Sequence, residues 1–406
     1  MRPKTTLLEL KSANDYCQEY EPPQSIMEGV WWPQNGPAVH GSQIPAFAHL
    51  DWYISRLMEK REHDLSQSGL QLDWSSILDG VQDLLVHPFN DGIDVRKMIA
   101  DREGVSLDRV VPTHGTTDAI HLALAAALPS GSKKIAVEMP AYTPVCHSAR
   151  LMGLETVEFE RIIDGPGEWR LDRDRLSELI PTVDGVLFTR IMNPTGFAIR
   201  DDDLDWLVEA TRMEGIPLLA DEVYDDCMRR SEKYRPLHSL GKHCVSMNSL
   251  TKIYGLGALR FGWFIASEEV AKNGHRAFQT FNGMMAIPSA RLAIAAWPHL
   301  EHALDAIEER RKHNIPLLEA VLEKHGIEWE APPFGVFGAF DIGCNAIDIV
   351  DGIAAEEGVL VVPGCMFHKD LSTWIRVAWS KEPKVFKDDV KALDRVLSRS
   401  GQSRDD

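Results

Sequence analysis

From about Val111 onward, short apolar runs alternate with longer segments of helical pattern. Continuous apolar strands separated by helices are typical of a parallel sheet that is covered by helices on both faces, because both faces of each strand are then buried. The pattern therefore predicts an α/β fold. The expected strands are Lys134–Glu138, Gly185–Thr189, Pro217–Asp221, Cys244–Ser249 and Phe261–Ala266, and the expected helices include Asp118–Leu128 and Asp201–Glu214.

The chain has 406 residues, which is too long for one compact core. Single hydrophobic cores stop growing near roughly 250–300 residues. We therefore predict a large domain over residues 50–295, and a smaller domain formed by an N-terminal arm, 1–49, together with 296–406.

The C-terminal third mixes helical and strand patterns. A helical stretch runs from about Ser289 to His325 and is interrupted near Pro298. The polar tail, Ser398–Asp406, is expected to fray. Three further strands are expected at Gly338–Ile342, Val359–Val362 and Trp374–Trp379.

The chain is acidic, with a net charge of −18 at pH 7. Such a charge repels phosphate backbones and anionic lipids, so neither nucleic acid nor a membrane is an expected partner. No apolar run approaches the ~20 residues of a membrane span, and the N-terminus lacks the pattern of a signal peptide. The six cysteines show no C-x-x-C spacing, so we predict no metal site and expect a cytoplasmic protein with reduced thiols.

The most specific motif is Ser249-Leu250-Thr251-Lys252, which ends one expected strand and is followed by a glycine-rich loop and Arg260. A lone lysine of this kind is usually an exposed loop residue. In this setting the glycines allow the backbone to approach a ligand, and the arginine offers a fixed fork for phosphate oxygens. A deprotonated Lys252 is able to form an imine with an aldehyde.

Two further motifs follow the apolar strands. Asp221 and Tyr224 belong to a D-E-x-Y motif at a strand's carboxyl end, where open α/β sheets bind ligands. A helix N-cap is the ordinary alternative for Asp221. Asn193 begins an N-P-T-G motif, which on its own would be a common turn.

The segment Gly115-Thr116-Thr117 opens the alanine-rich helix, and a Gly/Thr turn there is either an anion site or an ordinary N-cap. Tyr142 follows the strand Lys134–Glu138 and is placed either to stack on a flat ligand or to pack at the surface. Arg376 lies inside an apolar strand, so it must be paired or face a cavity. It is either a structural ion pair or a bidentate carboxylate clamp.

Taken together, in this order and spacing, and with Arg260 counted separately, these seven motifs resemble the class I/II aminotransferases of pyridoxal-phosphate (PLP) fold type I. The resemblance runs from about Asp91 to Ser380. It implies a large domain with a mainly parallel sheet flanked by helices, plus a smaller α+β domain, and it implies PLP as the cofactor.

The resemblance also implies roles for the matching residues. Lys252 would form the Schiff base with PLP, Asp221 would pair with the pyridine nitrogen, and Arg376 would bind the substrate's α-carboxylate. The remaining contacts would be those of Tyr142 on the ring face, of Asn193 and Tyr224 with the ring's phenolic oxygen, and of Gly115, Thr116, Thr117, Ser249 and Arg260 around the phosphate. Asn193 would also lie beside the substrate.

Family members are typically homodimers with active sites at the subunit interface, so the resemblance implies a homodimer for this chain. Two departures affect the expected substrate contacts. Where the family usually has a tyrosine that reaches the partner's phosphate, this chain has His87 nearby and no tyrosine. In the N-terminal arm, Gly29–Gly41 does not match the family's glycine motif.

The leading interpretation is an aminotransferase that acts on an L-amino acid and a 2-oxo acid through a Lys252 Schiff base and a quinonoid. The alternative is a lyase, cyclase or oxidase of the same fold that acts on a hydroxylated, arginine-type amino acid. Thr113-His114-Gly115 and Val361-Val362-Pro363-Gly364 resemble capreomycidine-synthase-like enzymes, and Phe367-His368 resembles PLP-dependent arginine oxidases.

The alternative from outside the enzymes is a non-enzymatic regulator or binding module of the same fold. Regulators of this kind usually carry a fused DNA-binding segment, for which the chain offers no extension. Its acidic balance opposes DNA binding, and Lys252 is present.

Overall fold

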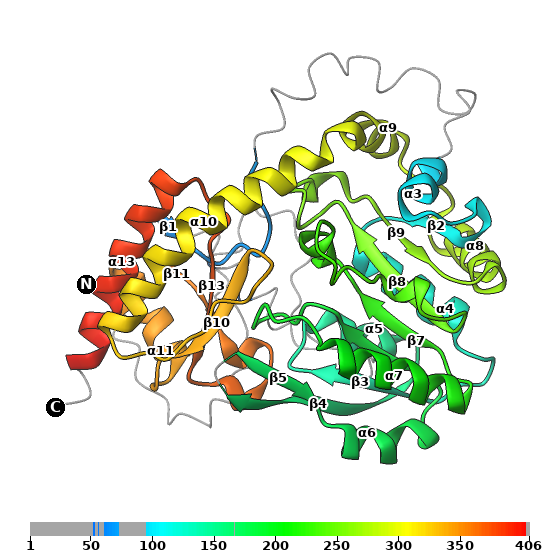
Figure 1. Ribbon diagram of the computed structural model, residues 1–406, viewed down its shortest axis with the longest axis horizontal. Helices are drawn as coiled ribbons and strands as arrows, with labels where there is room; N and C mark the ends of the chain where they lie inside the picture. The colour runs from blue at the N-terminus through cyan, green and yellow to red at the C-terminus, as the bar shows by residue number, and fades with distance from the viewer. Residues whose placement is uncertain (1–51, 53–55, 57–60, 73–94, 166, 403–406) are drawn as a thin grey trace, which may run out of the picture.

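A computed structural model describes residues 52, 56, 61–72, 95–165 and 167–402 (Figure 1). The described elements gather around a large sheet and, beside it, two small ones. No helix among the described residues is long and apolar enough to cross a membrane.

The large sheet has eight strands in the order β2-β9-β8-β7-β6-β3-β4-β5. Its central strands, from β8 to β4, are parallel, whereas the pairs β8/β9, β2/β9 and β4/β5 are antiparallel. The strands are β2 Val110–Thr113, β3 Lys134–Met139, β4 Glu155–Gly165, β5 Glu168–Leu171, β6 Val186–Thr189, β7 Leu218–Asp221, β8 Cys244–Ser249 and β9 Gly262–Ile265.

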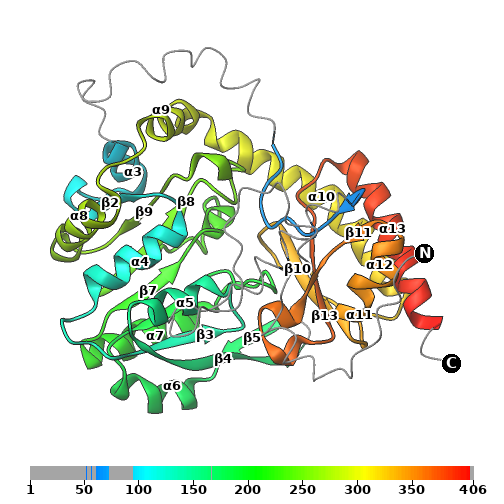
Figure 2. The ribbon, with the colours of Figure 1, turned by 180° about the vertical axis from the view of Figure 1, so that it is seen from behind.

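Helices cover both faces of this sheet. Successive side chains of a strand point to opposite faces, and along β6 Leu187 packs with α4, α5 and α8, whereas Phe188 packs with α6 and α7. The two helical layers are visible on the two sides of the sheet in Figures 1 and 2. The helices are α3 Val95–Glu103, α4 Thr116–Ala127, α5 Pro144–Leu151, α6 Arg173–Leu179, α7 Asp201–Glu214 and α8 Glu268–Asn282.

The smaller α+β part contains a three-stranded antiparallel sheet, β10-β13-β12, and a two-stranded parallel sheet, β1-β11. The long helix α10 runs from the large sheet towards these small sheets (Figure 1). The elements are β1 His63–Asp64, α9 Ile287–Ala296, α10 Leu300–Lys324, β10 Phe337–Asp341, α11 Ala346–Asp351, α12 Ile353–Glu356, β11 Val359–Leu360, β12 Val362–Pro363, β13 Trp374–Ala378 and α13 Pro383–Gln402.

The predicted α/β architecture is confirmed, including the helical break between α9 and α10 near Pro298. Two expectations were wrong in detail. The expected strand at Phe261–Ala266 is antiparallel to its neighbours, so the sheet is mixed at that edge. The tail does not fray from Ser398, because α13 continues to Gln402 and Ser400 is buried. The boundary between residues 295 and 296 stays a prediction.

Candidate active site

The carboxyl ends of the parallel strands open into a cavity of about 870 Å³. Asp221 is the last residue of β7, and Thr189 is the last residue of β6. Most of the residues singled out in the sequence lie on the wall of this one cavity. The predicted residues among its lining are Thr116, Thr117, Tyr142, Asn193, Asp221, Tyr224, Lys252, Arg260 and Arg376.

The two other predicted residues, Gly115 and Ser249, adjoin one end of the cavity. Gly115 is the N-cap of α4 with φ of 87°, so neither threonine is the cap. The Thr116 hydroxyl donates to Ser249 Oγ at 2.8 Å, and Ser249 Oγ lies 2.7 Å from Thr251 Oγ1. This end combines hydroxyl groups with the N–H groups of a helix N-terminus, which suits an anion.

Arg260 completes this anion-binding end. A Cβ placed on Gly115 would lie 2.7 Å from the Arg260 Nη2, so a side chain there would force the guanidinium to move from its present position. Arg260 itself adopts a left-handed backbone with φ of 47°, uncommon for a non-glycine residue. The local backbone therefore turns the arginine side chain towards the start of α4.

Asp221 supplies the buried carboxylate of the site. Its Oδ1 accepts a hydrogen bond from the Val223 N–H at 3.0 Å, so it caps the following turn as well as facing the cavity. Burial raises the pKa of Asp221 to about 7, although that hydrogen bond acts in the opposite direction. A buried carboxylate of this kind is strongly stabilised by a cationic ring nitrogen beside it.

Lys252 lies in the loop after β8, and its amine reaches the same cavity. Burial, followed by the positive charges of Arg376 and Arg260, lowers the pKa of Lys252 to about 8, while Asp221 acts to raise it. A substantial fraction of the amine is therefore neutral near physiological pH, as a nucleophile must be.

Arg376, on β13, is buried with oriented partners. Its Nη1 donates to Asn193 Oδ1 at 2.8 Å, and its Nη2 donates to the Ser66 carbonyl at 2.6 Å. The guanidinium also lies over the rings of Phe337 and Phe367, at 5.3 and 5.1 Å from their centroids. Arg376 also lines the cavity, so its guanidinium is placed to face a ligand there.

Asn193 owes its place to a sharp turn. The Gly196 N–H donates to the Met192 carbonyl at 2.8 Å, and Gly196 has φ of 81°. A Cβ there would lie 2.4 Å from the Phe337 carbonyl oxygen, so the turn requires glycine. The turn interpretation of N-P-T-G is therefore confirmed, and the turn directs Asn193 to Arg376, whereas a contact of Asn193 with the cofactor stays a prediction.

Tyr224 and Tyr142 lie on the cavity wall. Tyr224 is buried and contacts Phe337 edge-on, with 4.9 Å between the ring centroids. Burial raises the pKa of both phenols, that of Tyr142 to about 12, so both are neutral hydrogen-bonding groups at physiological pH.

Sequence reasoning missed one part of the site. Residues 66–70 (Ser-Gln-Ser-Gly-Leu) line the cavity, and Lys252 Nζ donates to Ser68 Oγ at 3.1 Å. The available signal was a small, polar, glycine-containing turn between two apolar leucines, Leu65 and Leu70. Two positions that depart from the family pattern, the stretch Gly29–Gly41 and His87, lie outside the described residues.

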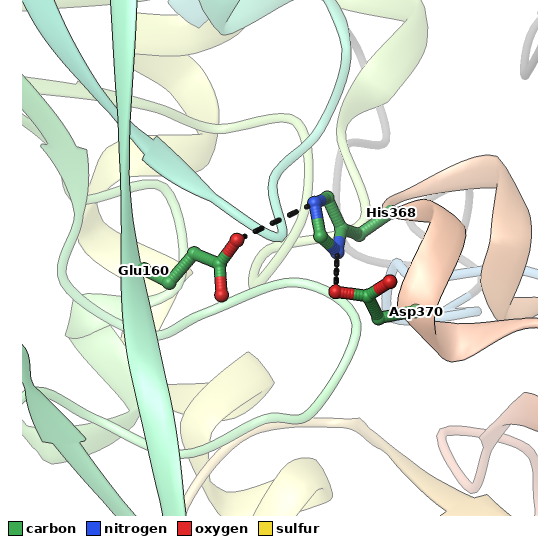
Figure 3. A group of neighbouring side chains, drawn as sticks. All are labelled: Glu160, His368 and Asp370. Atoms are coloured by element: carbon green, nitrogen blue, oxygen red, sulfur yellow. Dashed lines mark ion pairs between the residues drawn. The ribbon is translucent and has the colours of Figure 1, made fainter.

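Elsewhere in the described residues, one group of side chains has the spacing of a metal site: Glu160, His368 and Asp370 (Figure 3). His368 Nε2 lies 3.7 Å from Glu160 Oε1, whereas His368 Nδ1 lies 3.6 Å from Asp370 Oδ2. The two carboxylates thus face different nitrogens of one ring, which does not suit a single shared ion. The arrangement suits electrostatic contact between β4 and the loop before β13.

Comparison with known proteins identifies the family. The family model described as aminotransferase class I and II matches residues 88–387. This chain belongs to the class I and II aminotransferases. It is an enzyme, and its cofactor is PLP.

Among individual relatives of this aminotransferase-family chain, a histidinol-phosphate aminotransferase from Methylococcus capsulatus is 26% identical over 317 residues, covering 77% of this chain and 82% of the relative. A PLP-dependent aminotransferase from Streptococcus suis has the same fold, with a TM-score of 0.76, 21% identity, and coverage of 88% of this chain and 99% of that one. The PLP-dependent cyclase OrfR also shares the fold, with a TM-score of 0.75, 24% identity, and coverage of 90% and 99%.

The residues present fit PLP. One end of the cavity offers helix N–H groups, hydroxyls and Arg260 in the space that Gly115 leaves open, which suits a phosphate. The wall supplies the buried Asp221 carboxylate and a lysine whose pKa is lowered to about 8. These are the groups that a phosphorylated pyridine aldehyde requires.

Proposed function

We propose that this enzyme transfers the amino group of an L-amino acid to a 2-oxo acid, with PLP held covalently by Lys252. The observation that carries the proposal is the convergence of Lys252, Asp221 and Arg376 on one cavity. A lysine of lowered pKa, a buried carboxylate and an oriented arginine are together the minimum set that such chemistry needs.

When bound, PLP supplies an electron sink for the bond that breaks at the substrate's Cα. Thr116, Thr117, Ser249 and Arg260, with the backbone of Gly115, would hold the phosphate. Asp221 would keep the ring nitrogen protonated, because a buried carboxylate favours a cation beside it. Asn193 and Tyr224 would contact the phenolic oxygen, and Tyr142 would stack on the ring.

Arg376 would bind the substrate's α-carboxylate, while Asn193 holds the guanidinium in place through the 2.8 Å hydrogen bond. A fixed carboxylate orients the Cα–H bond relative to Lys252, which is catalysis by positioning. The neutral Nζ of Lys252 would then remove the proton from Cα and later return a proton as general acid.

The partners that follow from this proposal are small molecules, an amino acid and a 2-oxo acid. We also propose that the enzyme is a cytoplasmic homodimer. The family resemblance supports the homodimer, and the scattered cysteines without C-x-x-C spacing support the cytoplasm. The division into a large domain, 50–295, and a smaller one is likewise part of the proposal.

The shared fold of OrfR keeps a cyclase, lyase or oxidase as the second candidate. An anaerobic single-turnover absorbance series separates the two. The purified enzyme is mixed with a panel of amino acids, including arginine and 4-hydroxyarginine, without a 2-oxo acid. An aminotransferase loses the absorbance of the aldehyde form of the cofactor and regains it only when a 2-oxo acid is added. Product formation with an unchanged final spectrum would instead indicate a cyclase or lyase, and product formation only after dioxygen is admitted would indicate an oxidase.

The assignment of Lys252 has its own test. Borohydride reduction should attach the cofactor to the peptide that contains Lys252, as read by mass spectrometry, and Lys252→Ala should abolish the attachment. Lys242→Ala, a lysine in the loop before β8, is the control and should label normally. Labelling of Lys252→Ala at another lysine of the chain, at the wild-type level, would reject the assignment.

A further inference from the structure

The segment of residues 64–71 lies between the two halves of the site. At its start, the Leu65 N–H donates to the Leu360 carbonyl at 2.8 Å, and the Ala378 N–H donates to the Leu65 carbonyl at 2.9 Å. These bonds join the segment to β11 and to the end of β13, the strand that carries Arg376. Ser66 then accepts the hydrogen bond from Arg376 through its carbonyl.

The other end of the segment is bound to the lysine loop. The Leu70 N–H donates to the carbonyl of Lys252 itself at 2.8 Å. The Ser380 hydroxyl donates to the Gly69 carbonyl at 2.7 Å. Backbone contacts on both sides therefore fix the position of the residue between them, Ser68.

Ser68 is placed between two residues of the proposed machinery. Its Oγ accepts a hydrogen bond from Lys252 Nζ at 3.1 Å, and while burial raises the pKa of the Tyr224 phenol, the nearby Ser68 acts to lower it. We propose that Ser68 is a positioning residue that holds the free amine of Lys252 next to Tyr224 whenever the amine is not joined to the cofactor. The inference rests on the proposed role of Lys252.

The physical reason lies in the length of the lysine side chain. A free amine on four rotatable carbons samples many positions, whereas proton transfer needs a short and directed contact. A hydroxyl on a segment fixed at both ends offers the amine one preferred position. Because Ser68 Oγ accepts from the amine, it also stabilises the ammonium form and opposes the lowering of the Lys252 pKa by burial.

The test measures Lys252 directly. The full-length enzyme is loaded with pyridoxamine phosphate, which cannot form an imine and so leaves the amine free. Acetylation of Lys252 by acetic anhydride is then followed by mass spectrometry as a function of pH. Ser68→Ala should lower the midpoint of the labelling curve by about 1 pH unit, because the ammonium loses a hydrogen-bond acceptor. Ser68→Thr keeps the hydroxyl and should keep the wild-type midpoint.

Ser380→Ala is the matched control, because it removes a serine hydroxyl bound to the same segment but keeps the Ser68 hydroxyl and the backbone bond from Leu70 to Lys252 that holds the segment in place. It should leave the midpoint unchanged. In steady-state assays, Ser68→Ala should lower kcat by about tenfold or more with little change in KM, as expected for an effect on proton transfer.

An unchanged midpoint in Ser68→Ala, or an equal fall in Ser380→Ala, would overturn the inference. Failure of the wild-type chain to retain pyridoxamine phosphate after desalting would instead count against the proposed function. The labelling comparison can then be repeated on the ligand-free chain, so the two failures are distinguishable.

Discussion

At the scale of single residues, Asp221 is a carboxylate whose negative charge is destabilised by burial in the ligand-free chain. Asp221 is 6% exposed, and its pKa is raised from 3.8 to about 7. A group whose pKa is raised on folding contributes stability that is present below its ordinary pKa and is lost as pH rises through the folded value. At ~1.4 kcal/mol for each pKa unit, the cost above pH 7 is on the order of 4 kcal/mol.

We therefore predict that Asp221→Asn stabilises the ligand-free chain while weakening PLP binding. The gain in the free energy of unfolding should grow between pH 5 and pH 7 and then level off. Urea unfolding at a series of pH values measures it, and absorbance titration measures the affinity for PLP. A gain that is the same at every pH would show that the charge of Asp221 is not its cause.

Arg376 carries a second residue-scale prediction. Its two donor groups and the two flanking phenylalanine rings fit a planar guanidinium, which an ammonium cannot replace. Arg376→Lys should lower kcat/KM by roughly 30-fold to several thousand-fold, corresponding to about 2–5 kcal/mol. Arg200→Lys, on a surface pair with Asp202, is the matched control and should leave kcat/KM unchanged. Unchanged turnover in Arg376→Lys would exclude the carboxylate-binding role.

These residues differ in how far the sequence could reveal them. Lys252 and Asp221 each follow an apolar strand, so a local pattern was enough to place them at the sheet's carboxyl edge. Ser68 lies 184 positions from its partner Lys252. Its proposed role depends on the hydrogen bonds that join its segment to β11 and β13. A local sequence pattern does not reveal such long-range contacts, so the segment around Ser68 has the appearance of an ordinary turn in the sequence.

At the scale of elements, the start of α4 is shaped by one glycine. Gly115 has φ of 87°, and a Cβ there would lie 2.7 Å from the Arg260 guanidinium. Gly104 offers a matched position, with φ of 65° but open space around the same Cβ. Both sites have a positive φ, which penalises alanine. The penalty is larger at Gly115, whose ψ of 175° is almost exclusive to glycine, and only Gly115 adds a close contact with Arg260 at the proposed phosphate site.

Gly115→Ala should therefore weaken PLP binding by roughly tenfold or more, because ~1.4 kcal/mol of lost interaction gives that factor. Gly104→Ala should also lower thermal stability, by less than Gly115→Ala, but keep the wild-type affinity for PLP. Fluorescence titration of the ligand-free variants with PLP provides the measurement. Equal affinities in the two variants would mean that the space beside Arg260 is not used for the phosphate.

The elements also show what a local pattern cannot decide. A continuous apolar run has the same appearance in a parallel and an antiparallel strand. The sequence therefore indicates the position of β9 but not its antiparallel direction relative to β8. The end of α13 is polar in sequence, yet Leu397 and Ser400 are buried. Packing of the helix against the small sheets outweighs the polar composition that suggested fraying.

At the scale of the whole molecule, α8 and α9 leave apolar side chains exposed at one end of the large sheet's helical cover. Phe281 is 70% exposed, Met284 49% and Ile294 36%. All three lie on consecutive elements, α8, the following loop and α9. Exposed apolar side chains on consecutive elements favour burial against another surface.

We predict that this surface forms part of the proposed homodimer. In sedimentation velocity the wild-type chain should behave as a particle of twice 45.5 kDa. Phe281→Ser combined with Met284→Ser should raise the dimer dissociation constant at least tenfold, because burying the two side chains contributes about 1.5–3 kcal/mol each. Met213→Ser, which alters a side chain 69% exposed on α7, is the control and should remain dimeric. A monomeric wild type would reject the dimer, whereas equal dissociation constants in both variants would place its interface on another surface.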